Sequence, residues 1–138
     1  MKPPLWLGAD LVRALHAELL AEHGGLDARC NEALLESALA RPQQRFAYAD
    51  ASPALADLAA AYGYRLARNH SFSDGNKRVA LMAMYVFLRL NGQILGAPEV
   101  EAVAVIQDLA AGRFDEAALT AWLKARSKKL SSKKVRKR

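Results

Sequence analysis

The sequence predicts an almost entirely α-helical domain. Ala and Leu dominate the 138-residue chain, and both residues favour helix. β-branched residues are few, and no segment alternates apolar and polar side chains over the length of a strand. The length suits about one domain with its own hydrophobic core. The ten consecutive apolar residues 79–88 are too few to cross a bilayer, so we expect a buried helix there.

Two amphipathic helices are expected in the first third of the chain. Residues 10–22 place leucines on one face, and Gly24 and Gly25 after them are typical of a helix end. Residues 31–40 show the same apolar pattern. Pro42 is expected to end this second helix, because the residue before a proline is disfavoured in helical conformation.

The segment after Pro42 has no helical period. Within it, the alternation of Phe46 and Tyr48 predicts a short flap or hairpin near residues 43–51. A third helix should follow, with Ser52 as its N-cap and Pro53 at its first position. Its apolar side chains recur at helical spacing up to the polar residues that precede His70.

The apolar run predicts a central helix over about residues 76–91, with neighbours packed on nearly every side. Gly92 is expected to end it. Two further amphipathic helices are expected over about residues 98–111 and 115–126, the second capped by Asp115. Together these elements predict a compact helical bundle around one central helix.

The net charge of +6 belongs to the C-terminal end of the chain. Residues 126–138 contain eight Lys or Arg and no acid, which leaves twelve basic and fourteen acidic residues elsewhere. We therefore assign residues 1–126 to the folded domain and residues 127–138 to a basic, disordered tail. The alternative role for the tail is loose contact with RNA, the ribosome or an acidic partner.

The single cysteine, Cys30, excludes an internal disulfide and a cysteine-based zinc site. No apolar segment typical of a signal peptide follows Met1, and no run is long enough to span a membrane. We therefore expect a cytoplasmic protein with no membrane partner.

Residues 70–78 form a polar, glycine-containing loop that leads into the central helix. The first amide hydrogens of a helix lack partners, and the helix dipole favours negative charge there. Gly75 lets the backbone approach a ligand closely, and Asn76 can donate a side-chain hydrogen bond. Lys77 and Arg78 are cations at the end of the helix that disfavours them, which indicates a phosphate as the normal occupant. The alternative is a solvated first turn with surface cations.

Two further residues of the loop can carry chemistry. His70, as a neutral imidazole, can take a proton from an incoming hydroxyl, or it can be a structural residue bonded to backbone. Asp74 can cap the helix, or it can hold Mg²⁺ together with phosphate oxygens. Phe72 is interpreted as an apolar anchor for the loop, and His16 as a surface or capping residue.

The motif His-x-Phe-x-Asp-Gly-Asn-Lys-Arg before a long apolar helix resembles the Fic/Doc superfamily, and more narrowly its Doc, or death-on-curing, toxins of toxin–antitoxin modules. The stretch 34–42 and the sequence Leu90-Asn91-Gly92 are similar to further parts of that family. The resemblance covers about residues 5–125.

The resemblance implies a transferase that moves part of ATP to a protein hydroxyl. His70 would be the catalytic base, Asp74 would hold Mg²⁺, and residues 75–78 would bind the phosphates. Residues 43–51 would form a flap that aligns the target, with Arg45, Phe46 and Tyr48 as its docking side chains.

Lys77 stands where AMP-transferring members of the superfamily usually have Gly. Lys at this position is a mark of the Doc branch, in which the nucleotide is thought to bind reversed, so that the γ-phosphoryl group is transferred. The resemblance then implies a protein kinase that acts on elongation factor Tu and arrests translation. The internal inhibitory motif of some Fic proteins is absent, which implies a separate Phd-like antitoxin. AMP transfer and a non-catalytic binding module with a nucleic-acid-contacting tail are the alternatives.

Overall fold

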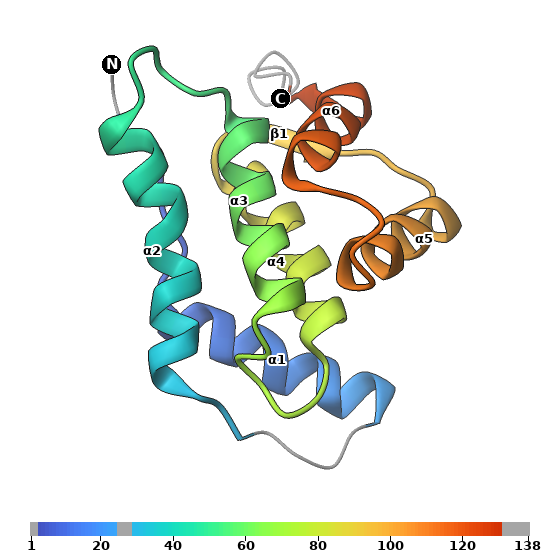
Figure 1. Ribbon diagram of the computed structural model, residues 1–138. Coiled ribbons are helices and arrows are strands. Elements are labelled where there is room, and N and C mark those ends of the chain that lie inside the picture. The colour runs from blue at the N-terminus through green and yellow to red at the C-terminus, as the bar shows by residue number, and fades with distance from the viewer. Residues whose placement is uncertain (1–2, 25–28, 131–138) are drawn as a thin grey trace, which may run out of the picture.

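The computed structural model describes residues 3–24 and 29–130 (Figure 1). Six helices and two short strands make up this part of the chain, which confirms the predicted all-α class. In chain order they are α1 (Ala9–His23), α2 (Glu32–Tyr48), α3 (Leu55–Arg68), α4 (Asn76–Leu90), β1 (Gln93–Leu95), α5 (Glu99–Ala110), α6 (Glu116–Arg126) and β2 (Ser127–Lys129).

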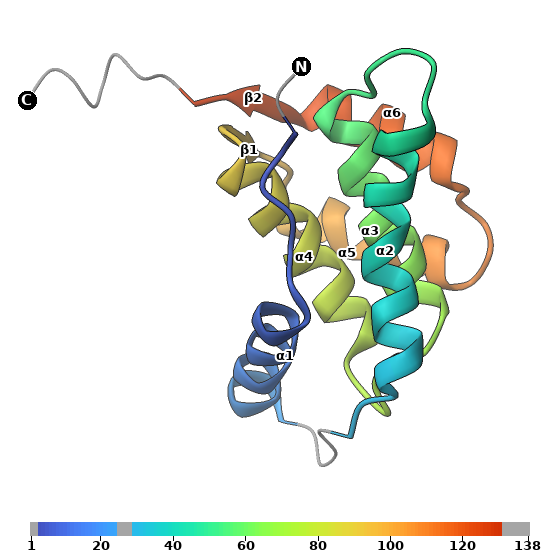
Figure 2. The same ribbon diagram turned by 90° about the vertical axis from the view of Figure 1, so that its left-hand side faces the viewer.

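Helix α4 is the centre of the bundle, as its apolar sequence predicts. It packs along α3 and also contacts α1, β1 and α5 (Figures 1 and 2). Its side chains Val79, Ala83 and Phe87 are completely buried. The ring of Phe87 packs against Tyr62 of α3, with ring centroids 5.1 Å apart. Burial raises the pKa of Tyr62 to about 12, and its hydroxyl accepts a hydrogen bond from Leu7 N (3.0 Å).

Most helix boundaries were predicted to within one residue. Helices α1, α4, α5 and α6 begin and end where the pattern indicated, and Asp115 caps α6 by accepting a hydrogen bond from Ala118 N (2.8 Å). Helix α3 begins later than predicted, because its N-cap is Ala54 and not Ser52. The carboxylate of Asp57 accepts a hydrogen bond from Ala54 N (2.9 Å), which satisfies an amide hydrogen at this helix end.

The predicted hairpin over residues 43–51 is wrong. Helix α2 continues through Pro42 to Tyr48. Tertiary contacts beyond the proline stabilise these last turns: Phe46 packs edge-on against Trp6 at 5.7 Å, and Arg45 forms ion pairs with other helices. Pro42 itself is buried, so its ring adds to the core while its missing amide hydrogen weakens the helix.

Helix α2 is long enough that its two ends lie at opposite ends of the bundle. The helix has 17 residues, which corresponds to a length of about 25 Å. Its first turn lies at the end of the bundle where the loop between α3 and α4 is found, and its last turn lies at the opposite end (Figures 1 and 2). The segment 43–51 is therefore far from the predicted catalytic loop.

The first residues of the predicted disordered tail are part of the fold. Residues Ser127–Lys129 form β2, which pairs antiparallel with β1 so that Ile94 lies opposite Lys128. Leu130 N donates to Gly92 O at 2.8 Å, just beyond the strand. The folded domain thus extends to Leu130, and the rest of the predicted tail, residues 131–138, lies outside the described residues.

Candidate active site

The loop over residues 69–75 joins α3 to α4 at one end of the bundle (Figure 1). Phe72 is its apolar anchor, as predicted, since only 3% of its surface is exposed. Its backbone is held by the side chain of Asn76, which accepts from Phe72 N (3.0 Å) and donates to Phe72 O (2.8 Å). Asn76 therefore organises the loop, and one of its two amide hydrogens remains for a ligand.

His70 is exposed, and the residues on either side of it are held firmly. Asn69 Nδ2 donates to Leu34 O of α2 (3.0 Å), and Ser71 Oγ donates to Asn69 Oδ1 (2.7 Å). Ser71 is 1% exposed. His70 has φ of 55°, in the left-handed region that residues other than glycine rarely adopt. A backbone conformation of this kind persists only where the surrounding contacts hold it in place, and residues in such conformations are found most often at functional sites.

The segment 29–31, just before α2, lies beside this loop. Asn31 N donates to Ser71 O (2.7 Å), and Ser73 N donates to Arg29 O (3.2 Å). The two segments line an open pocket of about 490 Å³ that also includes His70. Sequence reasoning missed this neighbour, because three residues are too few to show a strand period.

The N-terminus of α4 has the geometry of an anion site. Gly75 is its N-cap with φ of 84°, and the first backbone bond of the helix runs from Val79 N to Gly75 O (3.0 Å). The amide hydrogens of residues 76–78 precede that bond and have no partner within the helix. The exposed side chains of Lys77 and Arg78 form no ion pair with any described residue, so their charges are uncompensated.

The carboxylate of Asp74 is exposed next to this helix end. It is not the N-cap of α4, because Gly75 occupies that position, and its carboxylate accepts no hydrogen bond from a described residue. The described residues contain no group of three or more potential metal-binding side chains. A single carboxylate still fits Mg²⁺, which commonly takes one or two protein carboxylates and completes its shell with phosphate oxygens and water.

His16 was wrongly predicted as a surface or capping residue. It is 2% exposed on the inner face of α1, and its ring stacks on Phe72 with centroids 3.9 Å apart. Its Nε2 lies 2.7 Å from Asp74 O. A signal was present in the sequence, because His16 precedes Leu19 and Leu20 by three and four residues and so lies next to the apolar stripe predicted for this helix.

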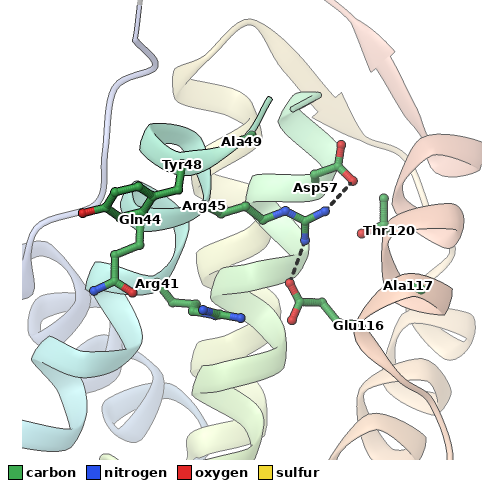
Figure 3. Close-up of a pocket in the computed structure, with 9 residues that line it drawn as sticks. All are labelled: Arg41, Gln44, Arg45, Tyr48, Ala49, Asp57, Glu116, Ala117 and Thr120. Carbon is green, nitrogen blue, oxygen red and sulfur yellow. Dashed lines mark hydrogen bonds and ion pairs between the residues drawn. The ribbon is translucent and has the colours of Figure 1, made fainter. Parts of the chain in front are cut away.

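The three predicted docking side chains lie at the other end of the bundle. Figure 3 shows Arg45 between Asp57 and Glu116, with nitrogen–oxygen distances of 3.3 and 3.0 Å. These residues line a polar pocket of about 640 Å³ between α2, α3 and α6. Phe46 packs on Trp6, and Tyr48 is 84% exposed at the end of α2. The structure therefore does not bring Arg45, Phe46 and Tyr48 together with His70.

A family model described as "Fic/DOC family" matches residues 6–88, the region from the segment before α1 to the last turn of α4. The chain belongs to the Fic/DOC family. The match includes the whole loop and confirms the resemblance inferred from the motif.

Two curated relatives have similar sequences. A protein named "Toxin Doc" from Mycolicibacterium smegmatis (strain ATCC 700084 / mc(2)155) is 47% identical over 88 residues, which cover 64% of this chain and 67% of the relative. A protein named "Protein kinase doc" from Escherichia phage P1 is 37% identical over 93 residues, 67% of this chain and 73% of the relative. Within the described residues, no helix combines the length and apolar character needed to cross a membrane.

Proposed function

We propose that this protein is the toxin of a toxin–antitoxin module and that it phosphorylates a Ser or Thr hydroxyl of a translation factor with ATP. Elongation factor Tu is the target that the family resemblance implies. The observation that carries the proposal is that exposed His70 belongs to the short loop that leads directly into α4, whose first turn carries the exposed cations Lys77 and Arg78 with no ion pair to a described residue.

The chemistry follows from these positions. His70 takes the proton of the target hydroxyl, whose oxygen attacks the γ-phosphorus, and ADP leaves with the electron pair of the broken bond. Backbone amides at the start of α4, together with Lys77 and Arg78, bind the phosphates and stabilise their charge. Asp74 would hold Mg²⁺, which neutralises developing charge on the phosphate oxygens.

The geometry also suggests where the target segment docks. The pocket that contains His70 is bounded by residues 29–31, whose backbone is partly extended and pairs with the loop. A target segment lying in this pocket would bring its hydroxyl to the exposed imidazole. We therefore assign target docking to residues 29–31, in place of the flap predicted from the sequence.

Two further considerations support the direction of transfer and the biological role. Lys77 would crowd the phosphate path used for AMP transfer, which favours transfer of the γ-phosphoryl group. The names of the two relatives, a toxin and a protein kinase, support a transferase that acts as a toxin and has an antitoxin partner. That this antitoxin is Phd-like is implied by the family resemblance. Contact of the basic tail with RNA or the ribosome stays a prediction.

The decisive experiment follows the position of the label. Wild-type protein and His70→Ala are incubated with Mg²⁺ and elongation factor Tu, with ATP labelled at the γ-phosphate in one reaction and at the α-phosphate in another. We expect label on the factor from the γ position alone, and none with His70→Ala. Label from the α position would establish AMP transfer instead and contradict the role given to Lys77.

Absence of label from both positions would contradict this target. Growth arrest by the full chain then separates the remaining alternatives. Arrest that persists after deletion of residues 131–138 but is lost in His70→Ala would exclude a non-catalytic module that acts through its tail. Growth arrest that is lost on deletion of residues 131–138 but persists in His70→Ala would support that module.

A further inference from the structure

A buried histidine lies directly beneath the proposed phosphate site. His16 is 2% exposed in the third turn of α1, on the same face as the buried residues Val12 and Leu19. Its Nε2 is 2.7 Å from Asp74 O, within hydrogen-bond distance. A carbonyl oxygen only accepts hydrogen bonds, so this ring nitrogen carries the hydrogen and donates it.

This hydrogen bond fixes the orientation of one peptide group in the loop. The described residues contain no cis peptide bond, and a trans peptide is planar with its C=O and N–H pointing in opposite directions. Because Asp74 O is directed at His16, the amide hydrogen of Gly75 points away from α1. The Gly75 amide hydrogen can therefore bind an anion together with the amide hydrogens of the first turn of α4, which have no partner within the helix.

The imidazole ring also sets the position of this peptide. A Cβ atom placed on Gly75 would lie 3.4 Å from both Cδ2 and Nε2 of His16, so the ring occupies the side of Gly75 toward which a side chain would point. On its other side the ring stacks on Phe72, with centroids 3.9 Å apart and planes inclined by 14°. His16 thus contacts the loop at both ends of the segment 72–75.

We infer that His16 is a positioning residue for the proposed phosphoryl transfer: its Nε2–H holds the Asp74–Gly75 peptide so that the Gly75 amide faces the phosphates. This inference rests on the proposed function. His16 touches neither of the reacting groups and acts through Gly75. Misplacing a donor at a site of phosphoryl transfer by about 1 Å is enough to lower the rate by about 100-fold.

The opposing interpretation is that His16 is only a core aromatic that packs on Phe72. The two interpretations differ in what they require of residue 16. Packing requires a flat apolar ring, which phenylalanine supplies. Positioning requires a donor at the place of Nε2, which glutamine supplies because its side-chain nitrogen is the same number of bonds from Cβ.

The test compares His16→Gln and His16→Phe in the full-length protein, with His23→Gln and His23→Phe as matched controls at the exposed last residue of α1. Folding is checked by circular dichroism and thermal unfolding. Phosphoryl transfer is measured as kcat and KM for ATP. Amide hydrogen exchange is measured in the nucleotide-free protein at Phe72 and Ser73, whose N–H groups donate hydrogen bonds to Asn76 Oδ1 and Arg29 O.

We expect His16→Phe to fold, to lose about 100-fold in kcat, and to exchange its loop amides about tenfold faster. His16→Gln should stay close to the wild-type protein in both measurements, and both His23 variants should be unchanged. Full activity of His16→Phe, or equal losses in two folded His16 variants, would overturn the inference.

The exchange measurement keeps this inference separate from the proposed function. If the wild-type protein transfers no phosphoryl group, the proposed function fails, while the loop exchange of the two variants still decides the role of His16. If His16→Phe does not fold, His16→Gln decides alone: a kcat and loop exchange near wild type support positioning, and losses in both overturn it.

Discussion

The two ends of the bundle carry the same kinds of side chain in opposite electrostatic states. At the end with the α3–α4 loop, Lys77 and Arg78 are exposed and have no ion pair with a described residue. At the other end, Arg45 lies between the carboxylates of Asp57 and Glu116, and its charge is compensated (Figure 3). An uncompensated cation at the positive end of a helix dipole is ready for an anion, whereas a paired one ties helices together.

This difference shows that residue types alone do not locate the site. Both ends have arginines, a carboxylate and an aromatic side chain, and the larger cavity lies at the end without His70. The end with the loop is distinguished by strained backbone at His70 and by free amide hydrogens at the start of α4. Backbone geometry is therefore what supports placing the proposed chemistry at that end.

The largest effect is expected from removing the anchor of the loop. Phe72→Ala deletes a buried ring and should lower the free energy of unfolding by about 3 kcal/mol, measured by urea denaturation. Phe46→Ala, which removes a half-buried ring at the opposite end, should cost less and leave loop amide exchange unchanged. An equal effect of both variants on the loop would show that the two ends are coupled, contrary to this comparison.

A smaller effect is expected from removing an uncompensated cation. Arg78→Ala should lower kcat/KM for ATP by about 30-fold, since a hydrogen bond to a charged group contributes about 2 kcal/mol. The control is Arg41→Ala, an exposed arginine of the other pocket, which should leave kcat/KM unchanged. If Arg41→Ala lost activity and Arg78→Ala did not, the phosphate site would have to be assigned to the pocket that contains Arg41.

Arg45→Gln should affect stability and not activity. It leaves the carboxylates of Asp57 and Glu116 without their cation, and we expect a loss of about 1 kcal/mol in the free energy of unfolding, because these groups are only partly buried. The loss should shrink in high salt and in the background of Asp57→Asn. Transfer activity per folded molecule should stay at the wild-type value, and a lower value would argue for a functional role of this ion pair.

The smallest effect is expected at the end of α2. Tyr48→Ser changes an 84% exposed side chain, so stability should stay within about 0.5 kcal/mol. The KM for the protein target should also be unchanged, because Tyr48 lies at the opposite end from His70. A raised KM for the target, with an unchanged KM for ATP, would restore the docking role that the sequence predicted for residues 43–51.

The sequence by itself determined the central helix, the loop before it and the residue types on which the proposed chemistry rests. Residues 79–88 are apolar on every side, which predicts a helix packed on most of its faces. Gly75, Lys77 and Arg78 mark a helix start that suits an anion. These signals are local: they depend on periodicity and on residues adjacent in the chain. The helix boundaries from α4 to α6 were predictable for the same reason.

Tertiary structure alone decided how far α2 extends, which segment accompanies the loop and which residues His16 contacts. Helix α2 continues past Pro42 because Phe46 and Arg45 find partners on other elements. Residues 29–31 lie beside the loop because they directly precede α2, whose first turn lies at the same end of the bundle as that loop. The last turn of α2, where the hairpin was predicted, lies at the opposite end. His16 is buried because Phe72 and Asp74 O, more than 50 residues later in the chain, satisfy its ring and its hydrogen bond. Contacts between distant residues set all three features, and no local pattern records such contacts.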